Sequence, residues 1–479
     1  MEFTSLIFAF FYSIIFLLYW WVPDKSKKLI LLTANILFYI SFGIQYILVL
    51  FAVIMFSFLA AKTVEGRKKK YWLLPAIMVT VFFLVFYKYS GFLLQILNTA
   101  FDVLGWKTIQ YSSMIAPIGI SYYTFQAISY VVDVYQGKIR AEKSFLDYAV
   151  YISFFPTILS GPIERAENML PQLHVVNKFD YANAVLGLER ILWGCFKKLV
   201  IADNLATYVN AVGTDIYSYS GFAIVLANLG YTIQLYCDFS GYSDMAIGFA
   251  QMLNIQVKDN FRAPYFASSI KEFWARWHIS LSSWLRDYVY IPLGGSKCSK
   301  FRSMLNLMIT FVISGMWHGA GIKYLIWGTL HGILQCVEKL FLNSNKNIME
   351  SRSESKRIIR GVRIIVTFLI INFTWLPFWL PTTSGFLYAV MHMFEGIGDV
   401  GTYVRNGFDS FSMNSYMVFT FLVSLIVLFI HDYKAVKNGI YDRFIVSNEK
   451  HRKWIRIVIL LMVLCGNCVA GSGFIYFQY

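Results

Sequence analysis

The sequence predicts an all-α polytopic membrane protein, on the evidence of its composition, its long apolar runs and the placement of its basic residues. Of its 479 residues, 57% are hydrophobic and only 14% are charged. Soluble domains carry roughly 45–50% apolar and about 25% charged residues. One aqueous globule of this size cannot bury so much apolar surface, so lipid must be the solvent for most of the chain.

The apolar runs are long enough to form membrane helices. A hydrocarbon core of about 30 Å needs about 20 helical residues, and fewer where the bilayer is thin. The longest candidates are Phe3–Trp21, Leu29–Phe42, Tyr46–Ala61, Tyr71–Phe86, Ile359–Leu380, Tyr416–Ile430 and Trp454–Ala470. Shorter runs lie near 116–134, 145–161, 221–236, 303–317 and 324–341. We therefore expect about ten to twelve embedded helices, some of which do not cross fully.

The basic residues gather in loops between these runs. The clusters lie at 25–28, 67–70, 297–302, 352–363 and 434–452. Cytoplasmic loops of membrane proteins are enriched in lysine and arginine, and this rule places both termini on the extracytoplasmic side. The net charge of +15 is then explained by topology and by contacts with anionic membrane lipids, and no nucleic-acid partner is expected.

The chain is expected to form a single membrane domain over 1–479. It shows no soluble domain of useful size and no internal repeat of the kind that many transporters carry. The six cysteines do not resemble a disulfide framework. Cys465 and Cys468 have the spacing of a metal pair, but the remaining ligands of a structural zinc site are missing. We therefore expect no metal and favour small residues in a packed helix.

Residues 234–296 form an unusually polar centre. The segment 234–244 places Asp238 and Asp244, with several hydroxyl groups, directly after an apolar run. Irregular, charged backbone at membrane depth is tolerated only where protein buries it or water reaches it. The polar centre 234–296 therefore predicts a water-accessible cavity within the helices or a re-entrant element.

Within this centre, 272–288 reads as one amphipathic helix. Its apolar stripe has spacings of three and four residues, at Trp274, Trp277, Leu281, Trp284 and Tyr288. His278 borders the stripe, and Ser282 and Arg286 follow it by one and two turns. An interfacial helix with a tryptophan belt explains the tryptophans. It does not explain an imidazole beside the apolar side.

A second histidine ends an apolar run at Trp317-His318, among Gly315, Gly319 and Gly321. One interpretation is a hydrogen-bonded histidine at a helix C-terminus. The other is functional, because ionisable groups at membrane depth usually serve function. A near-neutral imidazole can take a proton from a hydroxyl that attacks a thioester, and the glycines would let an acyl chain or backbone come close. The structural interpretation is favoured for the other histidines, His331, His392, His431 and His451, and stays open for His174.

Several motifs, taken in order along roughly 80–475, carry a resemblance to a known family. They are Pro117–Gln126, Phe155–Arg165, Gly194–Lys198, Asp238–Asp244, Trp277–Tyr288, Tyr290–Gly295 and Trp317–Ala320. Together they resemble the membrane-bound O-acyltransferase (MBOAT) superfamily, in its bacterial alginate and peptidoglycan O-acetylation branch. The D-alanyl-lipoteichoic-acid transferase branch is related, but Tyr290–Gly295 is more similar to the acetylation branch.

The resemblance implies a ring of helices around a thinned centre that is crossed by a tunnel. His318 matches the near-invariant catalytic histidine of the family, and His278 matches its second histidine. The donor would be a substrate, acetyl-CoA or an acyl-carrier thioester, with no bound cofactor. The implied partners are an extracytoplasmic SGNH-type acetyltransferase and, for a carrier-bound donor, a cytoplasmic acyl carrier protein. Candidates for the substrate path are Trp317, Ser282, Arg286, Asp287, Asp238 and Asp244.

The tail 474–479 resembles the aromatic C-terminal motif that carries an acyl-accepting tyrosine in the D-alanyl system. Tyr479 is therefore a third candidate catalytic residue. The alternative is an aromatic anchor at the membrane interface.

We expect a multi-pass enzyme of the bacterial plasma membrane that passes an acyl group, acetyl in the first place, from a cytoplasmic thioester to a cell-envelope polymer or exopolysaccharide. One alternative is D-alanyl transfer to teichoic acid. Another is a transporter or flippase for an acylated precursor, in which the histidines would relay protons. The acceptor polymer stays open.

Overall fold

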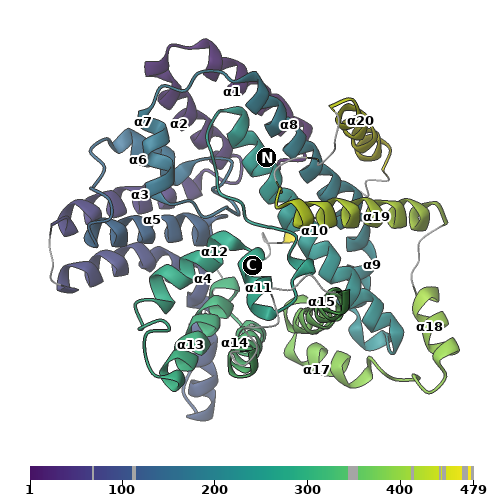
Figure 1. Ribbon diagram of the computed structural model, residues 1–479. Coiled ribbons are helices and arrows are strands. Elements are labelled where there is room, and N and C mark those ends of the chain that lie inside the picture. The colour runs from purple at the N-terminus through teal and green to yellow at the C-terminus, as the bar shows by residue number, and fades with distance from the viewer. Residues whose placement is uncertain are drawn as a thin grey trace. The chain divides into compact units, whose positions relative to one another are not determined.

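The structure is a computed structural model that describes residues 1–66, 70–110, 115–342, 354–410, 415–441, 444, 449–466 and 473–475 (Figure 1). Every regular element in these residues is helical, and no β-strand occurs among them. The predicted all-α class is confirmed. Tyr479 lies outside the described residues.

Five helical segments are long and apolar enough to cross a membrane: Gln45–Val64, Tyr71–Val103, Phe222–Met252, Ile358–Trp379 and Val418–Asn438. A shorter apolar helix, α1, covers Leu6–Trp21. These segments agree with a polytopic membrane protein. The larger number of embedded helices, their ring and the central tunnel stay predictions.

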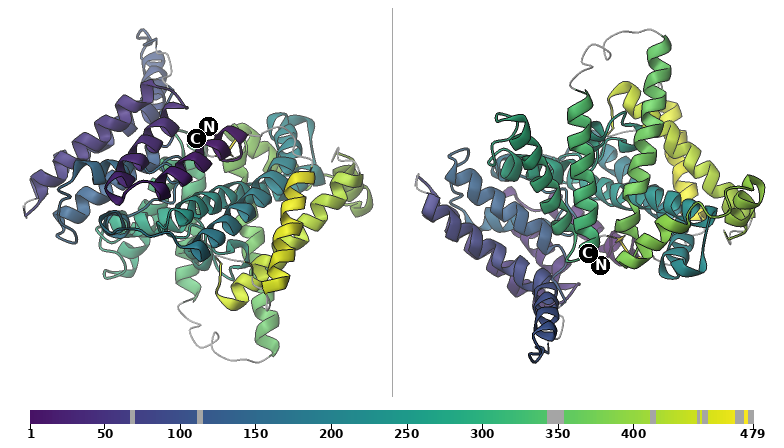
Figure 2. Two further views of the ribbon diagram at one scale, coloured as in Figure 1. Left: turned by 90° about the horizontal axis from the view of Figure 1, so that it is seen from above. Right: turned by 90° about the horizontal axis from the view of Figure 1, so that it is seen from below.

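The chain divides into two compact units. The first comprises 1–188 and 245–258. Its α5 is buried along nearly its whole length, as expected for a helix surrounded by protein rather than lipid. The helices of this unit after α1 are α2 (Asp24–Ile40), α3 (Gln45–Val64), α4 (Lys70–Val103), α5 (Ile120–Tyr135), α6 (Phe145–Ser153) and α7 (Ala166–His174), drawn in purple to blue in Figures 1 and 2.

The second unit comprises 189–244 and 259–479 and contains both candidate histidines. Helices α8 (Tyr181–Cys195) and α10 (Phe222–Met252) belong to both units by sequence. The others are the π-helix η1 (Phe196–Ala202), α9 (Asp203–Thr214), the 3-10 turns η2 (Ile216–Ser218) and η3 (Pro264–Phe266), α11 (Ile270–Arg276), α12 (Ile279–Leu285), the π-helix η4 (Arg286–Tyr290), α13 (Lys300–His318), α14 (Ile322–Leu342), α15 (Glu354–Thr374), α16 (Leu376–Trp379), α17 (Thr383–His392), α18 (Val400–Asp409), α19 (Ser415–Asn438) and α20 (Glu449–Cys465).

Of the two alternatives predicted for the polar centre 234–296, the re-entrant element is wrong for residues 234–244. These residues lie inside α10, which runs without interruption for 31 residues. The physical reason is that both aspartates have basic partners: Asp238 pairs with Lys198, and Asp244 pairs with Lys197 and Arg190. Once the side-chain charges are neutralised, the helix satisfies its own backbone, which is the cheapest solution in a low-dielectric environment.

The single amphipathic helix predicted over 272–288 is also wrong. A left-handed residue, His278 with φ 44°, separates α11 from α12. The preceding helix α11 begins in a capping box, because Ser269 Oγ accepts the Glu272 N–H and the Glu272 carboxylate accepts the Ser268 N–H. The apolar stripe is nonetheless buried from Trp274 to Trp284, so its periodicity marked the inner face correctly and missed only the break.

Helices α13 and α14 lie side by side, with their backbones in direct contact at Gly315 and Gly328 (Figure 1). A Cβ at Gly315 would overlap the carbonyl oxygen of Tyr324, and one at Gly328 would overlap that of Phe311. Only glycine permits this approach. Gly315 therefore serves backbone contact, one of the two roles predicted for the glycines near His318, and it fixes the end of α13 against α14, whereas Gly319 and Gly321 face the Tyr324 side chain.

Candidate active site

His318 is the last residue of α13 and is 3% exposed. Aromatic rings surround its imidazole. The ring centroid of Trp327 on α14 lies 4.9 Å away and that of Phe378 on α16 lies 5.2 Å away, both edge-to-face. The predicted burial of this histidine in the helical core is confirmed.

His278 belongs to the same cluster of rings, which Trp317 connects. The Trp317 centroid lies 4.9 Å from the His318 ring and 5.9 Å from the His278 ring. His278 is fully buried and also contacts Phe239 of α10 at 4.7 Å. The structure therefore brings together three of the predicted site residues, His278, Trp317 and His318. Two imidazoles that contact the same indole make up the candidate active site.

Asn260 orients His278, and sequence reasoning did not single it out. Its Oδ1 lies 3.1 Å from His278 Nδ1 and also accepts hydrogen bonds from the N–H and hydroxyl of Ser280. Because Oδ1 can only accept, His278 Nδ1 carries the proton and Nε2 keeps its lone pair. The Ile279 N–H donates to the Asn260 carbonyl at 2.9 Å, which holds the left-handed turn in place. No motif in the sequence relates positions 260 and 278.

Protonation of His278 is disfavoured. It lies between α11 and α12, outside the candidate spanning segments. Burial lowers the pKa of His278 to about 3, because a charged imidazole would lose its hydration there. A neutral imidazole with a protonated Nδ1 and an unprotonated Nε2 is the form that accepts a proton in general base catalysis.

His331 is a third buried histidine, for which a structural role was favoured. Its ring contacts Trp274, Trp327 and Trp375, and its Nδ1 accepts a hydrogen bond from Trp274 Nε1 at 3.3 Å. Trp327 separates it from His318, since the same indole contacts both imidazoles. A sequence signal existed, because His331 follows Trp327 by one helical turn on α14.

Three predicted path residues are not in this cluster. Ser282 Oγ donates to the Trp277 carbonyl at 3.2 Å, which closes the first turn of α12. Arg286 is largely exposed and pairs with its neighbour Asp287, with 2.8 Å between Nε and Oδ1. The exposed pair contacts neither histidine ring in the described structure.

Asp238 and Asp244 lie in two buried ion-pair clusters along α10. Lys198 Nζ lies 2.7 Å from Asp238 and 2.8 Å from Asp203. Lys197 binds Asp244 and the Ser240 hydroxyl. Arg190 joins Asp244 to Asp259 at 3.0 and 2.8 Å. Adjacent lysines of the π-helix η1 thus serve two aspartates that are six residues apart.

The described part of the tail reaches this region. The Ile475 N–H donates to Asp238 Oδ2 at 2.8 Å, and the Phe474 ring stacks on Tyr242 at 4.5 Å. Phe474 and Ile475 are both buried. The tail therefore enters protein at its start, whereas a simple interfacial anchor would face lipid headgroups.

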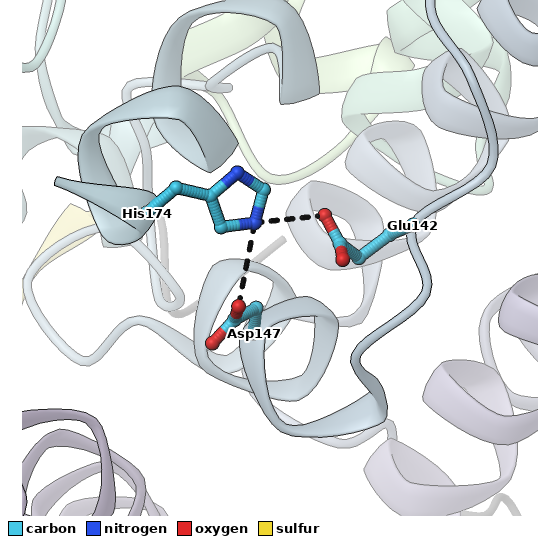
Figure 3. Close-up of side chains that lie close together, drawn as sticks. All are labelled: Glu142, Asp147 and His174. Atoms are coloured by element: carbon cyan, nitrogen blue, oxygen red, sulfur yellow. Dashed lines mark ion pairs between the residues drawn. The ribbon is translucent and has the colours of Figure 1, made fainter. Parts of the chain in front are cut away.

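His174, whose role the sequence left open, lies in an ion-pair cluster of the first unit (Figure 3). Its Nε2 lies 3.1 Å from Glu142 and 3.3 Å from Asp147. Asp147 also pairs with Lys28 of α2 at 2.8 Å. Although these groups have the spacing of metal ligands, the ammonium of Lys28 already neutralises the central carboxylate. The cluster ties α2, α6 and α7 together.

A cavity of about 280 Å³ lies in the second unit, and its lining includes neither His278 nor His318. It is almost wholly apolar and is lined by Trp193, Val427, Ile430, His431, Lys434, Phe444, Trp454, Ile455, Val458 and Ile459. Its residues come from α8, α19, α20 and Phe444, so it does not form the predicted tunnel to His318.

The helical fold with its long apolar segments defines, as a class, an integral membrane protein. Comparison with known proteins defines the class further. The model of the membrane-bound O-acyltransferase family matches residues 139–378, which include every residue of the histidine cluster. The chain belongs to this family, and it is a multi-pass membrane O-acyltransferase.

Three relatives illustrate the match. The probable alginate O-acetylase of Pseudomonas aeruginosa is 34% identical over 439 residues, which cover 89% of this chain and 81% of that protein. The peptidoglycan O-acetyltransferase of Helicobacter pylori is 36% identical over 382 residues, 73% of this chain and 70% of that protein. The teichoic acid D-alanyltransferase of Bacillus subtilis is 30% identical over 270 residues, 54% of this chain and 68% of that protein.

Proposed function

We propose that this enzyme transfers an acetyl group from a cytoplasmic thioester, acetyl-CoA or an acyl-carrier thioester, to an acceptor on the outer side of the bacterial plasma membrane, for O-acetylation of a cell-envelope polymer or exopolysaccharide. Relatives named as alginate and peptidoglycan O-acetylases support the acetyl group. The single observation that carries the proposal is the buried pair His278 and His318, which both contact the ring of Trp317.

The proposed reaction needs a base for the proton of the acceptor hydroxyl and an acid that protonates the leaving thiolate. His318 takes the proton of the acceptor hydroxyl as its oxygen bonds to the thioester carbonyl carbon. The carbon–sulfur bond then breaks, and the imidazolium returns the proton to the thiolate. His278, held by Asn260, assists as a second neutral imidazole. The low dielectric of the aromatic surroundings strengthens each of these electrostatic interactions.

The proposed acceptor is the phenol of Tyr479. A phenolate, with a pKa of about 10, leaves more readily than an alkoxide, so a tyrosine ester suits a relay. An extracytoplasmic SGNH-type acetyltransferase would take the acetyl group from Tyr479 to the polymer. This scheme needs the tail outside, as the charge distribution predicts for both termini. It also treats 1–479 as a single working membrane domain.

The test is incorporation of labelled acetyl groups by the purified full-length protein in lipid nanodiscs. His318→Ala should lower ester-linked label about 10²–10⁴-fold, the usual contribution of a general base. His392→Ala is a matched control, because His392 lies on α17, stacks on Tyr388 and is not part of the site. Normal labelling of His318→Ala would remove this histidine from the mechanism.

The relatives also favour one second candidate, D-alanyl transfer to teichoic acid. The teichoic acid D-alanyltransferase matches a smaller share of this chain than the alginate O-acetylase does. D-alanyl transfer also explains no observation that acetyl transfer leaves unexplained. Mass spectrometry of the C-terminal peptide separates the two, because the mass added to Tyr479 identifies the acyl group. An unmodified Tyr479 in an enzyme that remains active would reduce the tail to an anchor.

A further inference from the structure

We propose that Asp238, Lys198 and Asp203 form an anchoring site for the chain's own C-terminal segment, which holds Ile475 so that the tail can present its terminal residue to the histidine cluster. The inference rests on the proposed function for its purpose, but the anchoring site itself can be tested without it. Asp238 is then a positioning residue, and not the substrate-path residue that the sequence suggested.

The first observation is that the tail completes a buried charge network. Asp238 is 1% exposed, with one oxygen 2.7 Å from Lys198 Nζ and the other accepting the Ile475 N–H at 2.8 Å. Lys198 also pairs with Asp203, so one ammonium faces two carboxylates. A carboxylate buried in a dry environment needs hydrogen-bond donors or cations at both of its oxygens. The backbone N–H of the tail is such a donor.

The second observation is an apolar contact on the same face of α10. Asp238 and Tyr242 are one helical turn apart and therefore lie on one face. Asp238 binds Ile475, and Tyr242 stacks on Phe474 with 4.5 Å between ring centroids. Chain ends are poorly ordered unless they are tied down, and here two adjacent residues are held by two different kinds of contact.

The third observation is distance. Phe239 contacts the Phe474 ring at 6.1 Å and the His278 ring at 4.7 Å, so the anchored residues lie next to the histidine cluster. Four residues follow Ile475, and an extended chain of four residues spans at most about 14 Å. Anchoring at Ile475 therefore limits the reach of the residues that follow it to at most about 14 Å from this point. The restriction raises the local concentration of the acceptor at the site.

The local sequence explains how this site forms. The π-helix η1 turns Lys197 and Lys198 toward different aspartates of α10. Gly241 lets α10 approach closely, because a Cβ there would lie 2.8 Å from the carbonyl oxygen of Gly194. Without this close approach, the lysine would not reach Asp238.

The direct experiment is carboxypeptidase digestion of the full-length protein in lipid nanodiscs, followed by mass measurement of the truncated chain. Digestion of the wild type should stop before Ile475. In Asp238→Ala the digestion should continue past Phe474. The rate at which Ile475 and Phe474 are released should be at least tenfold higher than in the wild type. Asp244→Asn is the control, because it removes a buried ion pair of α10 that does not contact the tail.

A second variant covers the case in which Asp238→Ala fails to fold. Ile475→Pro removes the N–H that Asp238 accepts and also fixes φ at this position, whereas Ile475→Val keeps the N–H. Because carboxypeptidases cleave poorly at proline, protection of these two variants is read as hydrogen exchange of the C-terminal peptide, and we expect the proline variant, but not the valine variant, to lose it. Equal protection in Ile475→Pro and wild type would overturn the anchoring site.

The acetyl state of Tyr479 is measured on the same samples. Loss of Tyr479 acetylation in Ile475→Pro together with loss of protection supports both the site and its purpose. If Ile475 is protected in the wild type but Tyr479 never carries an acetyl group, the anchoring site stands and the proposed acetyl relay through Tyr479 is contradicted. Full Tyr479 acetylation in an unprotected Ile475→Pro variant would contradict the positioning role.

Discussion

Two regions of the second unit, the histidine cluster and the ion-pair clusters of α10, handle buried polar groups in opposite ways. His278 and His318 lie among aromatic rings, and a neutral side chain, Asn260, faces Nδ1 of His278. Asp238 and Asp244 each lie against lysine or arginine. A carboxylate held by ammonium groups is stable and unreactive, whereas a neutral imidazole keeps a basic lone pair. In the proposed mechanism, the neutral histidines carry out the reaction, and the ion-pair clusters of α10 support the structure around them.

The largest effect on stability is expected when the ion-pair cluster of Asp238 loses its lysine. Lys198→Ala leaves Asp203 and Asp238 buried beside each other without their shared cation, and we expect a loss of about 3–5 kcal/mol in the free energy of unfolding. Denaturant titration in detergent micelles measures this loss. Lys198→Arg, which keeps the charge, should lose much less. A stability change below about 1 kcal/mol in Lys198→Ala would show that the cluster is solvated.

The next effect tests whether the histidine cluster depends on orientation. Asn260→Ala removes the acceptor that fixes His278, and misplacement of a catalytic group by about 1 Å can lower the rate about 10²-fold. We expect acetyl transfer to fall by roughly this factor while the protein remains folded. Asn260→Asp, which keeps an acceptor oxygen at this position, should restore part of the rate. Equal rates in Asn260→Ala and Asn260→Asp would contradict an orienting role.

A smaller effect is expected at His331. His331→Phe keeps an aromatic ring among the tryptophans but deletes the acceptor of the Trp274 N–H. Leaving one buried donor unsatisfied costs about 1–3 kcal/mol of stability. Thermal unfolding should show this loss, with the transfer rate per folded molecule unchanged. A rate loss as large as that of His318→Ala would place His331 in the reaction itself.

The smallest effect is expected at the surface. Arg286→Ala breaks only the exposed pair with Asp287, and such pairs contribute about 0–1 kcal/mol. We expect no resolvable change in the denaturation midpoint. A large destabilisation would show that Arg286 has a buried partner.

The sequence predicted the parts of this structure that depend on local pattern. Composition and apolar runs gave the helical membrane class, and the position of His318 at the end of an apolar run gave its burial. The motif around Trp277 and the one around Trp317 gave the two histidines that the structure brings to one cluster.

The remainder depends on contacts between distant segments. The left-handed turn at His278 needs Asn260, eighteen residues away, so periodicity could not reveal the break between α11 and α12. The continuity of α10 depends on which lysine reaches which aspartate, and this is decided by the π-helix at 196–202. The tail contact joins Ile475 to Asp238, and no spacing in the sequence relates them.

The close contact between α13 and α14 limits how a substrate can arrive. With Gly315 against Gly328, the two helices share one backbone surface and cannot part locally without losing it. Whatever freedom exists around the terminal imidazole of α13 therefore lies in the rotation of Trp317, Trp327 and Phe378. Ring rotation is generally faster than the sliding of packed helices. Admission of a donor would then be timed by aromatic side chains, and enlarging or shrinking a single ring would change the rate of entry before it changed the chemistry.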